Sequence, residues 1–472
     1  MNDESRQGAS WLGKIRESGF GHGRIIIGLV ILASVVRLSF SQIYTPRYFP
    51  DSRDYFAQAQ AIAKNVFGAN VEIGKGNFPW PRPQVYPFII ACAGLNWSRV
   101  FFLQACMGIA ITVLLYLIFA RMSGSKLVGF FAGAGYALNP SQLLIEFGAM
   151  SQTTGTFLLM LALFFFFRII KKGSNPGWLD YLLSGVLIGI GMYCRSQFQV
   201  ILGFMLLFLL WRRAGRLRKH LVGVGLFILP VLGMTYLSGD LSSNFFETGV
   251  QPIHGITMSY NVVHLLEYAP DEYARERDIL IKYREDYRRS GGATLENCVA
   301  VALNELLAEP GMNIGKLSDK LGRMTLAIAR RAPLQYAKKI FQNLANFWRP
   351  AWFSHQYGIG AVLKGERLSS KIIAVIYTVF HLICMLIFIL LPLTLFFKSR
   401  LKTLLLYKGE VVFIYSIVLS TNLLGAVIQY GDPSYKISFE PLIIGISLWV
   451  IISFTGWLDR SDEGTEKFSA AS

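Results

Sequence analysis

Long apolar runs separated by short polar turns dominate the chain. A helix of about 20 apolar residues is long enough to cross the hydrocarbon core of a bilayer. We therefore expect an all-α integral membrane protein with about ten transmembrane helices. The expected spans are residues 24–43, 99–120, 126–144, 152–170, 179–194, 198–211, 220–237, 372–397, 411–429 and 437–457.

The composition supports this interpretation. Hydrophobic residues make up 53% of the 472-residue chain and charged residues only 16%, whereas a soluble domain usually has about a quarter charged residues. The mean hydropathy is +0.43. These values exclude an ordinary water-soluble protein.

The formal net charge of +17 is concentrated in short loops such as "WRRAGRLRKH" and "KSRLKTLLLYK". Basic loops between apolar runs belong on the cytoplasmic side, and such charges interact with membrane lipids. The turns around 145–151, 195–197 and 430–436 are poor in positive charge and are expected on the opposite face. We therefore predict a multi-pass protein of the inner (plasma) membrane with both termini cytoplasmic, and no nucleic-acid partner.

Two segments interrupt the pattern of spans. Residues 1–237 are predicted to form a transmembrane core whose first extracytoplasmic loop is 44–98. Residues 238–371 mix charge runs with amphipathic stretches, which predicts an extracytoplasmic and mostly helical segment. Residues 372–472 provide the C-terminal transmembrane helices and a cytoplasmic tail.

The first loop contains the clearest candidate chemistry, in the stretch "YFPDSRDYFAQAQAIAKN". One interpretation makes Asp51 the N-cap of an amphipathic helix, with Asp54 completing a box-like start. The other makes Asp51 a carboxylate that acts on a substrate. Prolines in "FPWPRPQVYPFIIACAG" restrict the backbone around Arg82 and Tyr86, so this loop is either a rigid part of a site or an ordinary interfacial loop.

A second candidate, Arg195, closes an apolar run on the predicted outer side. A cation there is costly unless it meets water, a headgroup or another anion. It either snorkels to ordinary lipid phosphate or binds a substrate phosphate.

The order of these motifs resembles the GT-C glycosyltransferases, in the branch of the protein O-mannosyltransferases and the aminoarabinose transferases of lipid A. "PDSRDYFAQAQAIA" followed by "RPQVYPFIIA" is similar to the first extracytoplasmic loop of that branch, and "GDPSYKISFEP" is similar to its last outer motif. The likeness covers most of the chain in order and hydropathy. The Arg of the family's last motif falls on Ser434, a departure that leaves Lys436 to supply the charge.

The resemblance implies transfer of a sugar from a polyprenyl-phosphate donor to an acceptor on the extracytoplasmic face, with inversion and with Asp51 as general base. It also implies a substrate-binding set. In this sequence that set comprises Asp54, Arg82, Tyr86, Glu146, Gln152, Arg195, Tyr435 and Lys436. The acceptor is a glycan, lipid or protein that the sequence does not identify.

No cofactor is expected. A divalent ion needs several converging carboxylates, and only Asp51, Asp54 and Glu146 can be assembled, so the sequence supports no metal. A transporter or flippase of lipid-linked saccharides, or a glycan polymerase or ligase, are the alternatives. Transporters usually place ionisable groups in mid-membrane and show repeated halves, whereas here the acids and bases gather in outer loops, which favours the enzyme.

Overall fold

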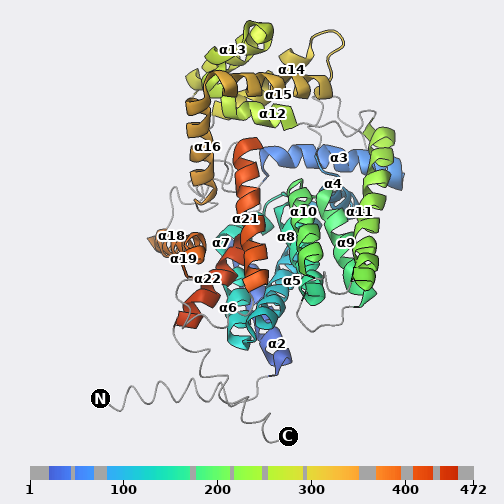
Figure 1. Ribbon diagram of the computed structural model, residues 1–472, viewed down its shortest axis with the longest axis vertical. Coiled ribbons are helices and arrows are strands. Elements are labelled where there is room, and N and C mark those ends of the chain that lie inside the picture. The colour runs from blue at the N-terminus through green and yellow to red at the C-terminus, as the bar shows by residue number, and fades with distance from the viewer. Residues whose placement is uncertain are drawn as a thin grey trace, which may run out of the picture.

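The computed structural model describes residues 21–43, 48–68, 82–170, 177–212, 217–246, 254–290, 295–349, 368–394, 408–428 and 436–454. Within these ranges the elements are helices and there is no strand. The prediction of an all-α membrane fold is confirmed. Figure 1 shows a helical bundle in the lower part of the molecule and a smaller group of helices above it.

The bundle helices follow the predicted spans closely. They are α2 (His22–Ile43), α5 (Trp97–Ser123), α6 (Lys126–Ala137), α7 (Pro140–Glu146), α8 (Gln152–Ile170), α9 (Trp178–Met192), α10 (Gln197–Arg212), α11 (Leu217–Phe246), α18 (Leu368–Ile389), α19 (Leu391–Thr394), α21 (Lys408–Ile428) and α22 (Glu440–Phe454). Among the described residues, four helices are long and apolar enough to cross a membrane, in α2, α5, α8 and α21, and five shorter helices are apolar.

The expected span 126–144 is two helices instead of one. α6 ends at Ala137, and the side chain of Asn139 accepts hydrogen bonds from the backbone N–H groups of Ser141 and Gln142 at 2.9 and 3.3 Å. Pro140 occupies the first position of α7, where its missing N–H is not needed. An Asn cap followed by proline therefore ends one helix and starts another.

The first loop forms α3 (Pro50–Phe67) and α4 (Val85–Cys92). α3 lies across the upper end of the bundle (Figure 1). Its apolar face packs with α4 in a small buried cluster that includes Tyr55, Ile62 and Tyr86, and Ile437 from the distant C-terminal part joins the same cluster.

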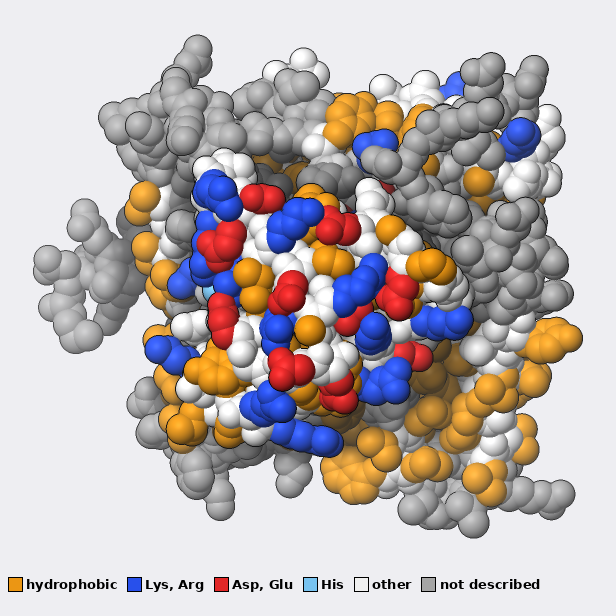
Figure 2. Space-filling model, turned by 90° about the horizontal axis from the view of Figure 1, so that it is seen from above, with side chains coloured by type: hydrophobic (Ala, Val, Ile, Leu, Met, Phe, Trp, Pro, Cys, Tyr) orange, Lys and Arg blue, Asp and Glu red, His pale blue; other side chains and the backbone are white. Residues whose placement is uncertain are grey.

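We call residues 254–347 the cap unit. Its elements are α12 (His254–Ser259), η2 (Tyr260–Tyr268), η3 (Asp271–Tyr273), α13 (Ala274–Arg289), η4 (Leu295–Asn297), α14 (Cys298–Leu307), α15 (Ile314–Arg331) and α16 (Pro333–Phe347). The unit has a hydrophobic core separate from that of the bundle. Acidic and basic side chains are interspersed over its upper face (Figure 2).

The crossing of α12 and α15 inside the cap unit depends on one glycine. A Cβ atom on Gly255 would lie 1.8 Å from the carbonyl oxygen of Ser318, so only glycine fits. The close approach also brings the Ser318 hydroxyl to the backbone N–H of Gly255, at 3.1 Å.

Candidate active site

Two acids on α3 share one arginine from the following loop. Arg82 Nη2 lies 2.6 Å from Asp51 Oδ1 and 2.9 Å from Asp54 Oδ2, and Arg82 Nε donates to the same Asp54 oxygen at 3.1 Å. Residues three apart on a helix lie on one face, which is why both carboxylates reach the same guanidinium. The sequence prediction placed these three side chains together, and the structure does so.

The capping interpretation of Asp51 is wrong. The N-cap of α3 is Phe49, and its backbone N–H donates to Ser52 Oγ at 2.8 Å. Asp51 instead lies in the first turn, where a negative charge is stabilised by the helix dipole. Its side chain is 32% exposed, and within the described residues its second carboxylate oxygen makes no hydrogen bond. One oxygen is therefore fixed by Arg82 and the other is available.

Arg82 is held firmly as a cation. Burial lowers its pKa, but the charges of Asp51 and Asp54 outweigh burial and leave the pKa above the ordinary arginine value. The guanidinium also lies over the ring of Tyr55, 5.7 Å from the ring centroid. This stacking orients the plane of the Arg82 guanidinium, which pairs with Asp51.

Tyr55 connects the acid pair to the second predicted cation. Its buried hydroxyl lies 3.0 Å from Ser151 Oγ. Burial raises the pKa of Tyr55, while the nearby charges of Arg82 and Arg195 act in the opposite direction. Arg82 thus contacts the ring of Tyr55, and the charge of Arg195 also acts on the Tyr55 hydroxyl.

Arg195 follows α9 and packs on the first turn of α8. A Cβ atom on Gly155 would lie 2.7 Å from Arg195 Cδ, so the glycine makes room for the arginine stem. The Nε atom of Arg195 is buried and has no hydrogen-bond partner among the described residues. Gln152, also predicted, is buried at the start of α8, next to Ser151.

Tyr86 lies under the site instead of facing it. The side chain is fully buried, packs edge-on against Tyr55 at 4.9 Å between ring centroids, and donates to Gln104 Oε1 at 2.6 Å. Gln104 in turn donates to the carbonyl of Glu146 at 2.6 Å. Tyr86 is thus a buried packing partner of Tyr55.

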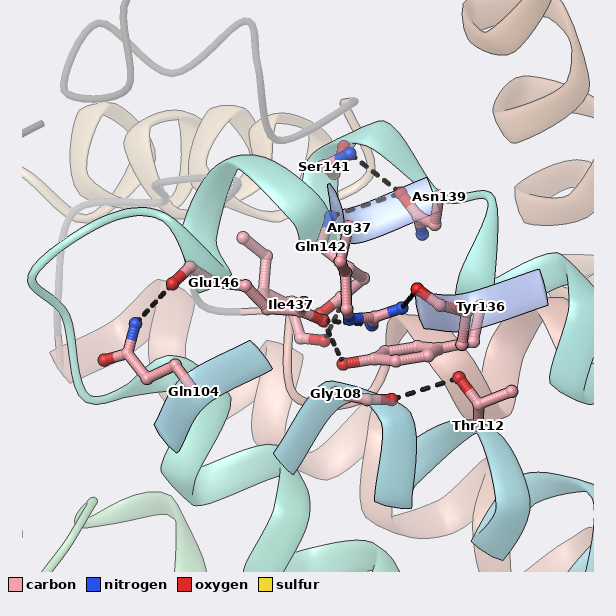
Figure 3. Close-up of polar contacts among 11 residues, drawn as sticks. Arg37, Gln104, Gly108, Thr112, Tyr136, Asn139, Ser141, Gln142, Glu146 and Ile437 are labelled. Atoms are coloured by element: carbon pink, nitrogen blue, oxygen red, sulfur yellow. Dashed lines mark hydrogen bonds and ion pairs between the residues drawn. The ribbon is translucent and has the colours of Figure 1, made fainter. Parts of the chain in front are cut away.

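Glu146 does not join the cluster around Asp51. It is fully buried and forms an ion pair with Arg37 of α2 at 2.6 Å, and Tyr136 donates to the same oxygen at 3.0 Å. Figure 3 shows this network between α2, α6 and α7. A Cβ atom on Gly108 would lie 2.3 Å from the Glu146 carboxylate, so α5 is shaped around the pair.

Lys436 is also buried, and its ammonium group donates to the backbone carbonyl of Arg349. This contact joins the start of the C-terminal segment to the residues just after the cap unit. Tyr435, and Ser434 where the resembling motif has Arg, lie outside the described residues.

Tyr260 of the cap unit, which was not predicted as a site residue, is close enough for the charges of Arg82 and Asp51 to act on its hydroxyl. Burial raises the pKa of its hydroxyl; the charge of Arg82 acts against this and that of Asp51 adds to it. Nothing in the local pattern of residues 254–268 distinguishes this tyrosine, because its position depends on how the cap unit packs. Across the described ranges, no three His, Cys, Asp or Glu side chains converge as metal ligands.

Comparison with known proteins agrees with this architecture. Residues 83–237 match the sequence model of the dolichyl-phosphate-mannose-protein mannosyltransferase family. The structure of the Archaeoglobus fulgidus oligosaccharyltransferase in the apo form aligns with 95% of this chain at 13% identity and a TM-score of 0.51. The chain spans about half of that protein, 52% of its length.

The chain also aligns with the structure of ArnT from Cupriavidus metallidurans bound to undecaprenyl phosphate. The alignment covers 90% of this chain and 77% of the ArnT chain, at 12% identity and a TM-score of 0.37. No curated protein matches the chain by sequence. The expected resemblance to GT-C glycosyltransferases is confirmed by the family match and at the level of the fold.

Proposed function

Starting from this GT-C likeness, we propose that the protein is an integral membrane glycosyltransferase that moves a sugar from a polyprenyl-phosphate donor to an acceptor, with Asp51 as general base. The observation that carries the proposal is the Asp51 carboxylate. One of its oxygens is fixed by Arg82 at 2.6 Å, and its side chain is one-third exposed beside the bundle end.

The proposed reaction is a single displacement at the anomeric carbon. The acceptor oxygen attacks that carbon, the bond from carbon to the carrier phosphate breaks, and the acceptor proton passes to Asp51. One base opposite the leaving group is sufficient for such an inverting step. The carrier leaves as a lipid phosphate, which takes the bonding electron pair and needs no external oxidant or reductant.

Support for a lipid-phosphate donor comes from the family match, whose description names dolichyl-phosphate mannose. An anionic leaving group requires cations or hydrogen-bond donors near it. Arg195 supplies a buried guanidinium nitrogen with no partner among the described residues, and its charge reaches Tyr55 beside Asp51. A base and a cation that both act on Tyr55 are compatible with a displacement between an acceptor and a carrier phosphate.

The distribution of basic loops supports an extracytoplasmic site. Positively charged connections belong to the cytoplasmic face, and the chain alternates them with the turns that precede α8 and α10. On this orientation α3 and the cap unit lie outside the inner membrane, and the donor approaches Asp51 from the bilayer boundary.

A transporter of lipid-linked saccharides is the second candidate, and one observation favours it. Two ionisable pairs are fully buried in the bundle, Arg37 with Glu146 and His381 with Glu440 at 2.8 Å. Buried ionisable residues often mark transport pathways.

A transfer assay separates the two candidates. The purified full-length protein in proteoliposomes receives a panel of radiolabelled undecaprenyl-phosphate sugars together with cell-envelope acceptor fractions. The transferase account expects label in an acceptor together with stoichiometric release of undecaprenyl phosphate. Donor that crosses the bilayer with its sugar still attached, and no labelled acceptor, would support the transporter and contradict the proposal.

A further inference from the structure

We propose that Ser438 joins Arg195 in a phosphate-binding cradle built over Gly155, and that the cradle takes the phosphate monoester of a lipid carrier. Ser438 is a binding residue that the sequence patterns do not single out. The assignment of a lipid carrier as ligand rests on the proposed function, whereas the cradle itself rests on the geometry of three segments distant in sequence.

Gly155 defines the floor of the cradle. It lies in the first turns of α8, and its backbone N–H donates to the carbonyl of Ser151 at 2.9 Å. The position of a Cβ atom on this glycine would lie 2.7 and 3.3 Å from Arg195 Cδ and Cγ and 3.8 Å from Ser438 Oγ. The arginine and the serine therefore meet above the same backbone position, and any larger residue there would displace the arginine.

Both side chains have hydrogen-bonding atoms that nothing in the described residues satisfies. Ser438 is 2% exposed, and its hydroxyl has no partner among these residues; the same holds for Arg195 Nε. Leaving a buried polar group unpaired is unfavourable, and most such groups in folded proteins are paired. Two unpaired donors on side chains that both pack over Gly155 favour a ligand that accepts hydrogen bonds.

A second buried serine shows that an unpaired hydroxyl is particular to Ser438 and not shared along this segment. Ser447 lies in α22, two to three turns after Ser438, and is also buried, yet its hydroxyl donates to the carbonyl of Cys384 at 2.7 Å. A buried serine in this part of the chain thus finds a backbone acceptor where no ligand is needed. Ser438 instead faces the arginine stem and the glycine.

The donors select an anion. A guanidinium nitrogen and a hydroxyl can both donate to phosphate oxygens, and the N-terminal end of α8 contributes partial positive charge. The charge of Arg195 also reaches Tyr55, next to Asp51.

The test measures binding of undecaprenyl phosphate to the purified full-length protein in nanodiscs, with no turnover required. Ser438→Ala is expected to weaken binding roughly tenfold or more, since a hydrogen bond to a charged group is worth about 1.5–3 kcal/mol. Ser438→Thr keeps the hydroxyl and is expected to bind within a few-fold of the wild type. Ser447→Ala is the matched control and is expected to bind as the wild type does.

Gly155→Ala provides an independent variant, because the added methyl group must move Arg195; binding is expected to fall although no donor is removed. Wild-type affinity in both Ser438→Ala and Gly155→Ala would overturn the cradle. Equal competition by phosphatidylglycerol would overturn the assignment to a carrier monoester and indicate an ordinary headgroup.

These results are separable from the proposed function. Binding that depends on Ser438 together with no sugar transfer would keep the cradle and contradict the transferase. Sugar transfer together with binding that ignores Ser438 would keep the transferase and overturn the cradle.

Discussion

At the scale of single residues, the site depends on a cation held between two acids. Arg82 pairs with Asp51 and Asp54 at once, which offsets the repulsion between the two carboxylates. The arrangement leaves the Asp51 carboxylate oriented and partly open to an incoming hydroxyl group.

Replacement of Arg82 tests this balance. Arg82→Gln is expected to lower the free energy of unfolding by about 1–3 kcal/mol, because two partly buried carboxylates then face each other without a cation. Adding Asp54→Asn to the variant is expected to recover most of the loss. Thermal unfolding of the detergent-purified proteins measures both effects, and an unchanged midpoint in Arg82→Gln would contradict the interpretation.

Helical spacing placed Asp51 and Asp54 correctly on one face of a helix. Arg82, which lies 31 and 28 positions after them, was expected beside them from the motifs of the first loop. Glu146 and Lys436 were expected beside them, but their partners are 109 and 87 positions away. No local pattern reports such pairings, because packing of the whole bundle decides them.

At the scale of elements, the helices were largely predictable because apolar runs and breaking residues are both local signals. The division between α6 and α7 was missed although Asn139 and Pro140 mark it, since the apolar run continues through the break. The 3₁₀ turns of the cap unit, and the place of Tyr260 at the start of η2, carry no such signal.

One ion pair inside the cap unit gives an element-scale prediction. Burial alone would raise the pKa of Glu296, but hydrogen bonding with His264 and the charge of Lys339, 2.6 Å away, bring the pKa to about 2. Because this folded-state value lies below the ordinary value of about 4.3 for an unfolded chain, Glu296 stabilises the fold above that pH. The stabilisation is lost as pH falls from about 4 toward 2.

The measurement compares thermal unfolding of the wild type and Glu296→Gln between pH 7 and pH 3. The wild type is expected to have the higher unfolding midpoint at pH 7. The difference between the two midpoints should stay constant down to about pH 5 and narrow below pH 4. Glu272→Gln, which changes an exposed acid in η3 of the same cap unit, is the control. A difference in midpoint that widens as the pH falls would contradict stabilisation by the ionised Glu296 side chain.

At the scale of the whole molecule, the cap unit is fastened to the bundle by two buried asparagines. Asn261 donates to the carbonyl of Val427 at 2.8 Å, and Asn343 donates to that of Ala426 at 3.0 Å and to Asn261 at 2.8 Å. Carbonyls near the end of α21, which have no helical partners beyond that end, are thereby satisfied. α16, the last helix of the cap unit, extends from the other cap-unit helices to this contact (Figure 1).

Loss of this connection is expected to loosen the cap unit without unfolding it. Asn343→Ala should raise amide hydrogen exchange in α16 and η2, since it removes two buried hydrogen bonds worth about 1 kcal/mol each. Exposed Asn304→Ala in α14 is the matched control. Exchange rates in α16 identical to the wild type would show that other contacts hold the cap unit.

The most direct test of the whole account is sugar transfer by Asp51→Asn, measured beside binding of undecaprenyl phosphate and beside Asp54→Asn, which changes the other acid on the same guanidinium. Asparagine can still accept a hydrogen bond from Arg82 but cannot take a proton. We expect Asp51→Asn to lower turnover by roughly a hundredfold or more with carrier binding unchanged, and Asp54→Asn to have the smaller effect. Near-normal turnover in Asp51→Asn would contradict the account.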